Sequence, residues 1–509
     1  MKTPILGSSY VTRSVNAADN RMVNLFPEVI PEGGKEPGFL NRAPGLNFLQ
    51  AVGTGPIRGL WAHQTNGTDF YVVSGVEVYK LTGLTSTPLL LGKVSGTGPV
   101  SIADNGTQIF FACNGPSYIY NEVTNVFAPI SDPDFPGALT VGYLDGYFVF
   151  NEPNSQRIWV TALLDGTDID ALDFASAEGS PDGLVAVNID HREAWLFGSD
   201  SVEVWYNAGL PDFPLTRIQG AFNEIGCVAT FSVAKLDNTL FWLGTDARGQ
   251  GIVYKANGYS GQRVSTHAVE WQIQQYGNIS DAIAYTYQQD GHSFYVLTFP
   301  SANATWVYDA ATQAWHERAG WNNGSFMRHR SNCQCNFGGN TVVGDFQNGN
   351  IYTLDLDVYA DNGQIQRWLR SWRALPTGQN NLKRTAQHSL QLDAQAGALL
   401  APVSEAVQLI TEDGFGLITE SENILIDETA LLFNPPPQFM LRWSDDGGHT
   451  WSNEHWAQGG AVGAYGTRIF WRRLGMTLKL RDRVYELSGT DPIQIAIMGA
   501  ELGISPTNV

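Results

Sequence analysis

Short runs of apolar, β-forming residues separated by polar turns recur along the middle of the chain. Between Ile57 and Leu356 one sequence pattern occurs seven times. It consists of a small or acidic turn, four to six β-forming residues, a turn of Gly, Asn, Asp or Ser, and a strand of alternating apolar and polar residues with an aromatic residue near its end. Residues 70–79 and 108–120 hold two of the copies. Successive copies start roughly forty to fifty residues apart, a period at which small antiparallel sheets bury their faces against their neighbours. This pattern predicts a β-propeller of six or seven blades.

The composition and length agree with an all-β chain. The 509 residues include 54 glycines, 24 prolines, 15 Trp, 19 Tyr and 25 Phe, which favours short strands and tight turns. A propeller of about forty-five residues per blade takes up roughly three hundred residues, so further structure must lie outside the ring. We expect an N-terminal docking segment at 1–50, the propeller at 51–362, and an additional C-terminal β-sandwich-like domain at 363–509.

The sequence contains no signal for membrane insertion or export. No stretch approaches the roughly eighteen uninterrupted apolar residues that a membrane-spanning helix needs, and the first residues lack the apolar core of a secretory signal. We therefore expect no membrane-spanning segment, and a protein that is made and used without export.

The four cysteines do not predict a disulfide framework or a metal site. Cys113, Cys227, Cys333 and Cys335 are few and scattered. Only one residue separates the last two, whereas structural zinc sites space paired ligands by two to four residues and need a second ligand pair. Buried reduced thiols are the favoured interpretation, and we expect neither metal nor cofactor.

The formal net charge of −20 argues against general affinity for nucleic acid, because phosphate contacts depend on clustered Lys and Arg. The charge is unevenly distributed, since residues 397–437 contain seven acidic residues and no Lys or Arg while the flanking segments are basic. Within this insertion, segments 409–414 and 417–422 echo each other around a Gly-Phe-Gly turn, which predicts a projecting acidic hairpin. An alternative is a hairpin that is merely solvated and whose acidic edges discourage strand pairing.

Both ends of the chain carry motifs that the blade pattern does not explain. Near the N-terminus are Gly-Ser-Ser-Tyr-Val-Thr-Arg-Ser at 7–14, Asn-Leu-Phe-Pro-Glu at 24–28 and Arg-Ala-Pro-Gly-Leu at 42–46. Near the C-terminus are Leu-Arg-Trp-Ser-Asp-Asp-Gly-Gly-His-Thr-Trp-Ser at 441–452 and Arg-Arg-Leu-Gly at 472–475. These motifs resemble those of the packaged-DNA stabilisation or tail-nozzle (tail hub) proteins of short-tailed bacteriophages. Between the two ends, the resemblance lies in the spacing of the blade repeats and not in residue-level motifs.

The resemblance implies a structural tail protein of the virion that is not an enzyme and carries no cofactor. Relatives form a hexameric tube, assembled in the cytoplasm of the bacterial host, that retains packaged DNA and later conducts it into a host cell. The implied partners are further copies of the chain, a tail adaptor above, tail fibres or spikes, and double-stranded DNA that passes without sequence-specific binding. Tyr10, Arg13, Arg21 and Asn24 are then candidates for contact with the adaptor or a neighbouring subunit.

Within such a tube the acidic insertion acquires a physical role. Duplex DNA carries about one negative charge per 1.7 Å of its axis, so a lumen lined with carboxylates repels the duplex and lets it slide. We place residues 397–437 at the channel-facing tip of the nozzle as a hypothesis. The channel-lining candidates are Glu412, Asp413, Glu420, Glu422, Asp427 and Glu428.

One C-terminal motif supports a competing, enzymatic interpretation. Ser444, Asp446, Gly448, Thr450 and Trp451 match the Asp-box, a hairpin turn that recurs in the blades of sialidases and related glycosidases. In such a turn Ser and Asp satisfy backbone N–H groups and the glycines permit positive φ, so we interpret it as a structural turn. A sialidase would carry several boxes within its propeller, whereas this chain has one box outside the repeats.

The alternative function is therefore a carbohydrate-binding or glycoside-cleaving propeller. Carboxylate pairs such as Asp165 with Asp168, or Asp355 with Asp357, have the chemistry that glycoside cleavage uses, although such pairs are common in loops of an acidic protein. Tryptophans among the blades would stack on sugars if exposed, but packing between blades uses the same residues. The first function predicts a ring or tube without glycan turnover, and the second predicts a monomer or small oligomer with a pocket on one propeller face.

Overall fold

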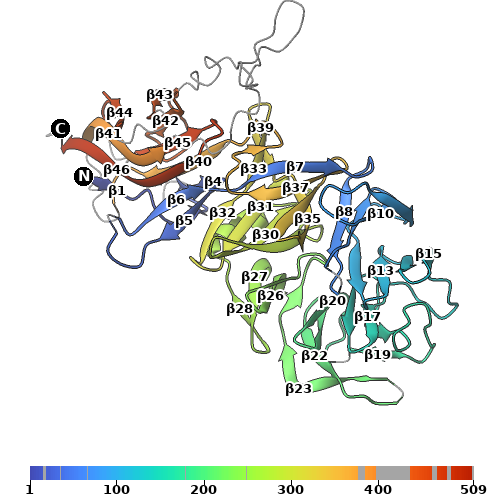
Figure 1. The fold of residues 1–509 in the computed structure, drawn as a ribbon. Helices are drawn as coiled ribbons and strands as arrows, with labels where there is room; N and C mark the ends of the chain where they lie inside the picture. Colours follow the sequence, from blue (N-terminus) through green and yellow to red (C-terminus); the bar gives the residue numbers. More distant parts are fainter. Residues whose placement is uncertain are drawn as a thin grey trace, which may run out of the picture. The chain divides into compact units, whose positions relative to one another are not determined.

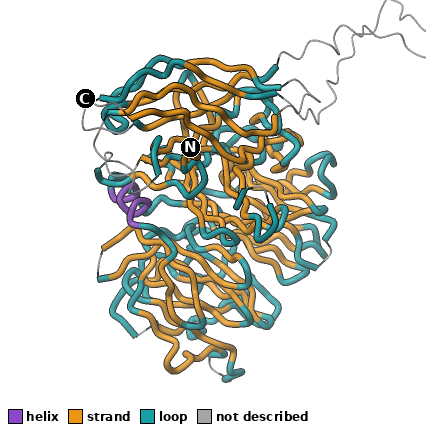
Figure 2. Tube along the Cα trace, turned by 90° about the vertical axis from the view of Figure 1, so that its left-hand side faces the viewer, coloured by secondary structure: helices purple, strands orange, loops and turns teal. Residues whose placement is uncertain are grey.

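The computed structural model describes residues 1–14, 19–34, 36–65, 67–177, 179–211, 213–247, 249–376, 384–396, 436–460, 467–478 and 483–506. Within these residues the chain is almost entirely β, and Figure 2 shows strands throughout with α1 (His267–Gln274) as the one helix. The chain divides into two compact units. We call them the propeller unit (Ser9–Arg13 and Leu46–Leu354) and the sandwich unit (Met1–Ser8, Ser14–Gly45 and Asp355–Val509). Across the described ranges, no helix has the length and apolarity to cross a membrane.

The propeller unit contains seven antiparallel sheets, the blades, which follow one another along the chain (Figure 1). Blade 1 consists of β8 (Ile57–Ala62), β9 (Phe70–Ser74), β10 (Glu77–Leu81) and β11 (Leu89–Lys93), and blade 2 consists of β12 (Ser101–Asp104), β13 (Gln108–Ala112), β14 (Ser117–Asn121) and β15 (Val126–Pro129). Blade 3 consists of β16 (Val141–Leu144), β17 (Tyr147–Asn151), β18 (Arg157–Val160) and β19 (Phe174–Ser176). Blade 4 consists of β20 (Leu184–Asp190), β21 (Glu193–Gly198), β22 (Val202–Asn207) and β23 (Leu215–Asn223).

The remaining three blades complete the ring. Blade 5 consists of β24 (Gly226–Cys227), β25 (Ala234–Leu236), β26 (Thr239–Asp246), β27 (Gly249–Asn257) and β28 (Ser260–Arg263). Blade 6 consists of β29 (Ile283–Gln289), β30 (His292–Phe299), β31 (Ala304–Asp309) and β32 (Ala314–Glu317). Blade 7 consists of β35 (Ser331–Phe337), β36 (Asn340–Asp345), β37 (Asn350–Asp355) and β7 (Gly45–Ala51). The unit also holds β2 (Tyr10–Val11) and the hairpin of β33 (Ala319–Asn322) and β34 (Ser325–Arg328).

Blade strands are apolar on both faces because each face packs against a neighbouring blade. In β13, Phe111 contacts Tyr71 of blade 1 with ring centroids 6.3 Å apart, and the adjacent Phe110 contacts Phe148 of blade 3 at 5.4 Å. Successive residues of a strand point to opposite faces, so one strand serves two interfaces. All five residues of β9 and of β13 are accordingly buried. The prediction of a propeller is confirmed, with seven blades.

Two-residue turns with positive φ join the first and second strands of several blades. Asp145 (φ 49°) and Gly146 (φ 103°) join β16 to β17, and Asp237 (φ 47°) and Asn238 (φ 62°) join β25 to β26. Two consecutive positive φ angles match the right-handed twist of a hairpin, and Asn, Asp and Gly tolerate that conformation best. Because every blade runs in the same sense, these turns place carboxylates and amides on one face of the ring, which we call the turn face.

The ring is closed by a strand from the beginning of the propeller sequence. β7 pairs with β37 as the fourth strand of blade 7, whose other strands come from the end of that sequence. Just beyond β7, the backbone N–H of Val52 donates to the carbonyl of Gly349 at 2.7 Å. Blade 7 therefore links the two ends of the repeat region by hydrogen bonds.

Substituting Gly349 by Ala is expected to weaken this closure. A β-carbon on Gly349 would lie 2.4 Å from the carbonyl oxygen of Gly53 and 2.5 Å from that of Val52, and backbone atoms cannot rotate away. We expect the free energy of unfolding of the propeller unit to fall by about 1–3 kcal/mol, measured by urea denaturation. Gly277→Ala is the matched control, because no atom lies within 4 Å of the β-carbon that it would gain. Equal stability of the two variants would show that blade 7 does not depend on this contact.

The sandwich unit packs two antiparallel sheets face to face. One sheet is formed by β44 (Ile469–Arg472), β41 (Thr385–Ala396), β46 (Ile495–Pro506), β6 (Gly38–Arg42) and β5 (Leu25–Val29), with β1 (Lys2–Thr3) beside β46. The other includes β4 (Met22–Val23), β40 (Trp368–Arg373), β45 (Val484–Gly489), β42 (Gln438–Ser444) and β43 (His455–Gln458). Leu390 and Leu392 of the first sheet share one core with Trp372, Phe439 and Leu441 of the second. The unit also holds β3 (Asp19–Asn20), β38 (Ala360–Asp361) and β39 (Gln364–Ile365).

The N-terminal residues take part in both units. Residues 1–50, expected as a docking segment, supply β1, β4, β5 and β6 to the sandwich unit and most of β7 to blade 7. The acidic hairpin expected at 397–437 lies outside the described residues, apart from its last two positions.

Candidate functional site

Polar contacts on the turn face tie successive blades together. The indole N–H of Trp61 in blade 1 donates to Asp104 Oδ2 of blade 2 at 2.6 Å. Lys235 Nζ of blade 5 lies 2.5 Å from Asp190 Oδ1 of blade 4. Ser293 of blade 6 donates its hydroxyl to Asp237 of blade 5 at 2.6 Å. In each pair a carboxylate at or near the end of an inner strand accepts from the neighbouring blade, so these acidic residues hold the ring together.

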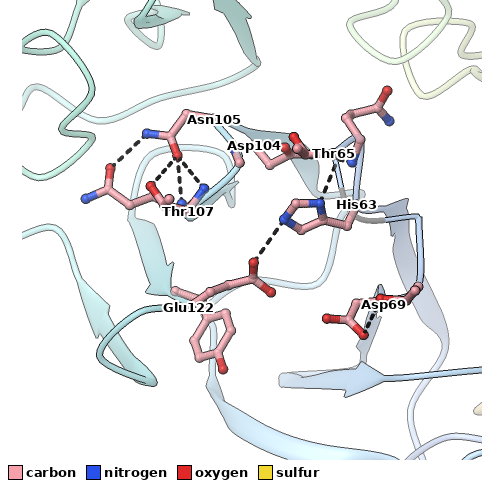
Figure 3. Close-up of polar contacts among 12 residues, drawn as sticks. His63, Thr65, Asp69, Asp104, Asn105, Thr107 and Glu122 are labelled. Carbon is pink, nitrogen blue, oxygen red and sulfur yellow. Dashed lines mark hydrogen bonds and ion pairs between the residues drawn. The ribbon is translucent and has the colours of Figure 1, made fainter.

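A denser cluster joins blades 1 and 2 around His63 (Figure 3). His63 lies between β8 and β9 and Glu122 follows β14, and His63 Nε2 is 2.9 Å from Glu122 Oε2. The backbone N–H of Thr65 donates to His63 Nδ1 at 3.1 Å, so in the neutral ring the proton is on Nε2 and faces the carboxylate. Lys80 Nζ lies 2.9 Å from Glu122 Oε1 and 2.8 Å from Asp69 Oδ2.

The cluster keeps its carboxylate and ammonium groups ionised. Burial acts to raise the pKa of Glu122, but hydrogen bonds from Tyr71 and Lys80 and the nearby charges of Lys80 and His63 lower it below its usual value. Burial acts to lower the pKa of Lys80, and its hydrogen bonds to Asp69 and Glu122 raise it instead. His63 is only 3% exposed. With its ionic groups paired and its imidazole enclosed, the cluster is suited to fastening two blades together.

Replacing Glu122 by Gln is expected to destabilise the propeller unit in a pH-dependent way. The folded pKa of Glu122 is depressed, so its contribution is present above the unfolded pKa of about 4.3 and is lost as pH falls through the folded value. At pH 7 we expect a loss of about 1–3 kcal/mol, shrinking toward zero in acid, measured by urea denaturation at several pH values. Glu224→Gln, at an exposed position of the same unit, is the control. A pH-independent loss would contradict the role of the ionised carboxylate.

The five residues of the Asp-box form a local hydrogen-bonded turn in the sandwich unit. Ser444 Oγ donates to Asp446 Oδ1 at 2.6 Å and accepts the N–H of Gly448 at 2.8 Å. The N–H and the hydroxyl of Thr450 donate to Asp446 at 2.8 and 2.6 Å, and Gly448 has a φ of 100°. Hydrogen bonds from Ser444 and Thr450 hold the pKa of Asp446 well below its usual value. The ring of Trp451 lies under Arg442, whose guanidinium carbon is 4.8 Å from the ring centroid.

The four candidate interface residues fall into different environments. In the propeller unit, Tyr10 lies in β2, and the exposed Arg13 lies over the ring of Trp271 in α1, 5.1 Å from its centroid. In the sandwich unit, the backbone N–H of Arg21 donates to Ser371 Oγ at 2.8 Å. Asn24 is fully buried, with a φ of 53°, and its amide donates to the carbonyl of Arg367 at 2.8 Å. Asn24 thus has a role inside its own unit.

All six carboxylates expected to line the channel, from Glu412 to Glu428, lie outside the described residues. Asp165 accepts hydrogen bonds from Gln108 and Thr167, as a turn residue does. Burial raises the pKa of the Cys335 thiol to about 12. In the part of the chain that the structure describes, no three His, Cys, Asp or Glu side chains are grouped so that they could hold a metal ion.

Sequence reasoning missed the His63 cluster. His63, Lys80 and Glu122 come from three separate loops or strands of two blades, and they have no fixed spacing that a motif could capture. The only available signal is the position of each residue relative to its own blade repeat, because residues near equivalent turns meet on the same face of a propeller.

The fold defines a propeller-and-sandwich protein in which polar contacts tie neighbouring blades together. Family models match both parts: one described as Bacteriophage P22 Gp10, beta-propeller, over residues 1–359, and one described as Bacteriophage P22 Gp10, beta-sandwich, over residues 408–505. The chain belongs to this family of packaged-DNA stabilisation proteins. It is therefore a structural protein of a phage tail and a component of the virion, and the predicted family is confirmed.

No curated protein sequence matches the chain significantly. Among solved structures, "Structure of U3-55K" has a TM-score of 0.38 and 10% identity, covering 61% of this chain and 99% of that chain. "YCF48 from Cyanidioschyzon merolae" has a TM-score of 0.40 and 13% identity, covering 61% and 98%. Similarity at this level supports no inference about function.

Proposed function

We propose that the protein is the tail nozzle of a short-tailed phage, a hexameric ring that retains packaged DNA in the virion and conducts it into the host on infection. The observation that carries this proposal is the match of both parts of the chain to packaged-DNA stabilisation models. The ring would assemble in the host cytoplasm below a tail adaptor and beside fibres or spikes. Its action would depend on shape, oligomerisation and electrostatics, without catalysis.

The distribution of charge supports both the passage of DNA and the assembly of the ring. The net charge of −20 disfavours adhesion of DNA, and residues 397–437 concentrate seven carboxylates without a Lys or Arg. We propose that Glu412, Asp413, Glu420, Glu422, Asp427 and Glu428 line the channel. Elsewhere in the C-terminal part Arg468, Arg472 and Arg473 are exposed, so opposite potentials on adjacent copies would help to order them around the ring.

The stoichiometry of the purified protein tests the proposal. Mixed with the tail adaptor at low salt, the protein is expected to form a complex containing six copies, measured by native mass spectrometry. Raising the ionic strength is expected to weaken the complex, because it screens the charge pairing between exposed groups. A protein that stays monomeric beside its adaptor would contradict the nozzle, and a hexamer indifferent to salt would contradict the electrostatic pairing alone. Arg13→Glu, which reverses an exposed charge of the candidate interface, is expected to reduce assembly while lowering the stability of the monomer by no more than about 0.5–1 kcal/mol, the contribution of its exposed contact with the Trp271 ring.

A further inference from the structure

The axis of the propeller unit holds a cavity of about 720 Å³. The inner strands of blades 1 to 4, 6 and 7 and the chain leading into β25 of blade 5 contribute to its lining. Its volume falls within the roughly 300–1,000 Å³ that is usual for small-ligand sites. Apolar side chains cover much of the wall, and four aromatic residues contribute to it: Trp61, Tyr143, Phe231 and Tyr285.

Trp61 is held in a fixed orientation at this cavity. Its indole N–H donates to Asp104 Oδ2 at 2.6 Å. The same carboxylate accepts the backbone N–H groups of Gln64 and Gly106, each at 3.2 Å. Because Asp104 is 5% exposed and receives three hydrogen bonds, both the carboxylate and the indole edge are immobilised before any ligand arrives.

Other polar groups of the wall have unused hydrogen-bonding capacity. The hydroxyl of Tyr143 in β16, the amide of Asn188 in β20 and the hydroxyl of Thr230 make no hydrogen bond to the described part of the chain, and all three line the cavity. The ring of Tyr143 packs on Phe148 with centroids 5.4 Å apart, which fixes the direction of its hydroxyl. These groups can both donate and accept hydrogen bonds.

The charged residues of the wall are already paired. Arg58 donates to the carbonyls of Gly98, Gly75 and Ser95 at 2.6, 2.8 and 3.1 Å. Asp104 is satisfied as described above, and Lys235 lies 2.5 Å from Asp190. These are the three charged residues among the described residues of the lining. A phosphate or carboxylate ligand would need an unpaired cation that this wall does not offer, so the cavity favours a neutral molecule.

We propose that the cavity binds a neutral saccharide. A sugar ring presents an apolar C–H face, which stacks on a rigid aromatic ring, and a rim of hydroxyls, which both donate and accept. Trp61 supplies the stacking surface, and Tyr143 and Asn188 supply hydrogen bonds from two further blades. This binding site is independent of the nozzle function, because it is complete within one propeller unit. It would let the same protein hold a neutral glycan of the cell surface.

The test is titration of the purified full-length protein with neutral mono- to trisaccharides of glucose, galactose, mannose and rhamnose. Binding is detected by the change in tryptophan fluorescence. At least one of these saccharides is expected to bind with a Kd of about 10 mM or lower. Trp61→Ala is expected to weaken that binding about tenfold, and Tyr143→Phe and Asn188→Ala each about threefold. Tyr143→Phe keeps the packed ring, so it reports on the hydroxyl even if Trp61→Ala unfolds the protein.

The control is Trp456→Ala, which removes a tryptophan that is 59% exposed in the sandwich unit. It is expected to leave the affinity unchanged. Glucose 6-phosphate and galacturonic acid serve as charged probes. The proposal is overturned if no neutral probe binds, if the Tyr143 and Asn188 variants bind like the unmodified protein, or if only the charged probes bind.

Discussion

Replacing Arg42 by Met is expected to lower the free energy of unfolding of the sandwich unit by about 3–5 kcal/mol. Arg42 is 2% exposed, and its guanidinium donates to the backbone carbonyls of Asp491, Ile493, Tyr359 and Gln366 at 2.6, 3.0, 3.2 and 2.9 Å. Burial lowers its pKa to about 10, opposed by Tyr359, Asp361 and Asp491, so the side chain remains charged at neutral pH. Its removal leaves four carbonyls in the interior without their donor.

Urea denaturation combined with hydrogen exchange of β6 and β46 measures this loss. The stability of Arg42→Lys is expected to lie between that of the unmodified protein and that of Arg42→Met. The lysine ammonium keeps the charge, but it cannot donate to several carbonyls at once as the planar guanidinium does. Arg468→Met, at an exposed position of the same unit, is the control and is expected to change stability by less than about 0.5 kcal/mol. If Arg42→Met behaves like Arg468→Met, the guanidinium is not what joins these segments.

On the proposed channel-lining role, replacing the carboxylates of the acidic insertion by amides is expected to make the protein bind duplex DNA more tightly. With Glu412, Asp413, Glu420, Glu422, Asp427 and Glu428 replaced by Gln or Asn, the assembled protein loses six negative charges per copy. We expect its affinity for double-stranded DNA at low salt to rise by about tenfold or more and to fall again as salt is added. Filter binding over a salt series measures both effects, and virions carrying the variant are expected to release DNA more slowly.

The control for this experiment removes the same number of charges elsewhere. Six exposed carboxylates of the propeller unit are replaced by their amides: Asp134, Asp168, Asp170, Asp200, Glu224 and Asp290. If both sets raise DNA affinity equally, the effect reflects overall charge, and the insertion has no special relation to the channel.

Much of the fold is predictable from the sequence because blade strands are local and periodic. The pair of neighbouring aromatics Phe110 and Phe111 already indicates a strand covered on both faces, and the structure shows them in two different blade interfaces. Closure by β7 is different, because its partner β37 lies at the far end of the repeat region and no local pattern connects the two. The same applies to β6, which pairs with β46 from the C-terminal end of the chain.

Site contacts follow the same distinction between local and distant partners. The Asp-box can be interpreted from sequence since Asp446 meets its donors within four residues. Arg42 stands in a recognisable motif, but its carbonyl partners lie hundreds of positions away, so its burial gives no sequence signal. Trp61 and Tyr143 come from different blades and meet around a central cavity only once the ring is closed.

Electron cryo-microscopy of the purified protein bound to its tail adaptor would show whether the copies enclose a channel. We expect a closed ring of six copies with an axial bore wide enough for duplex DNA, and with residues 397–437 facing that bore. A reconstruction that shows isolated copies, or a ring whose acidic segments point away from the axis, would contradict this expectation.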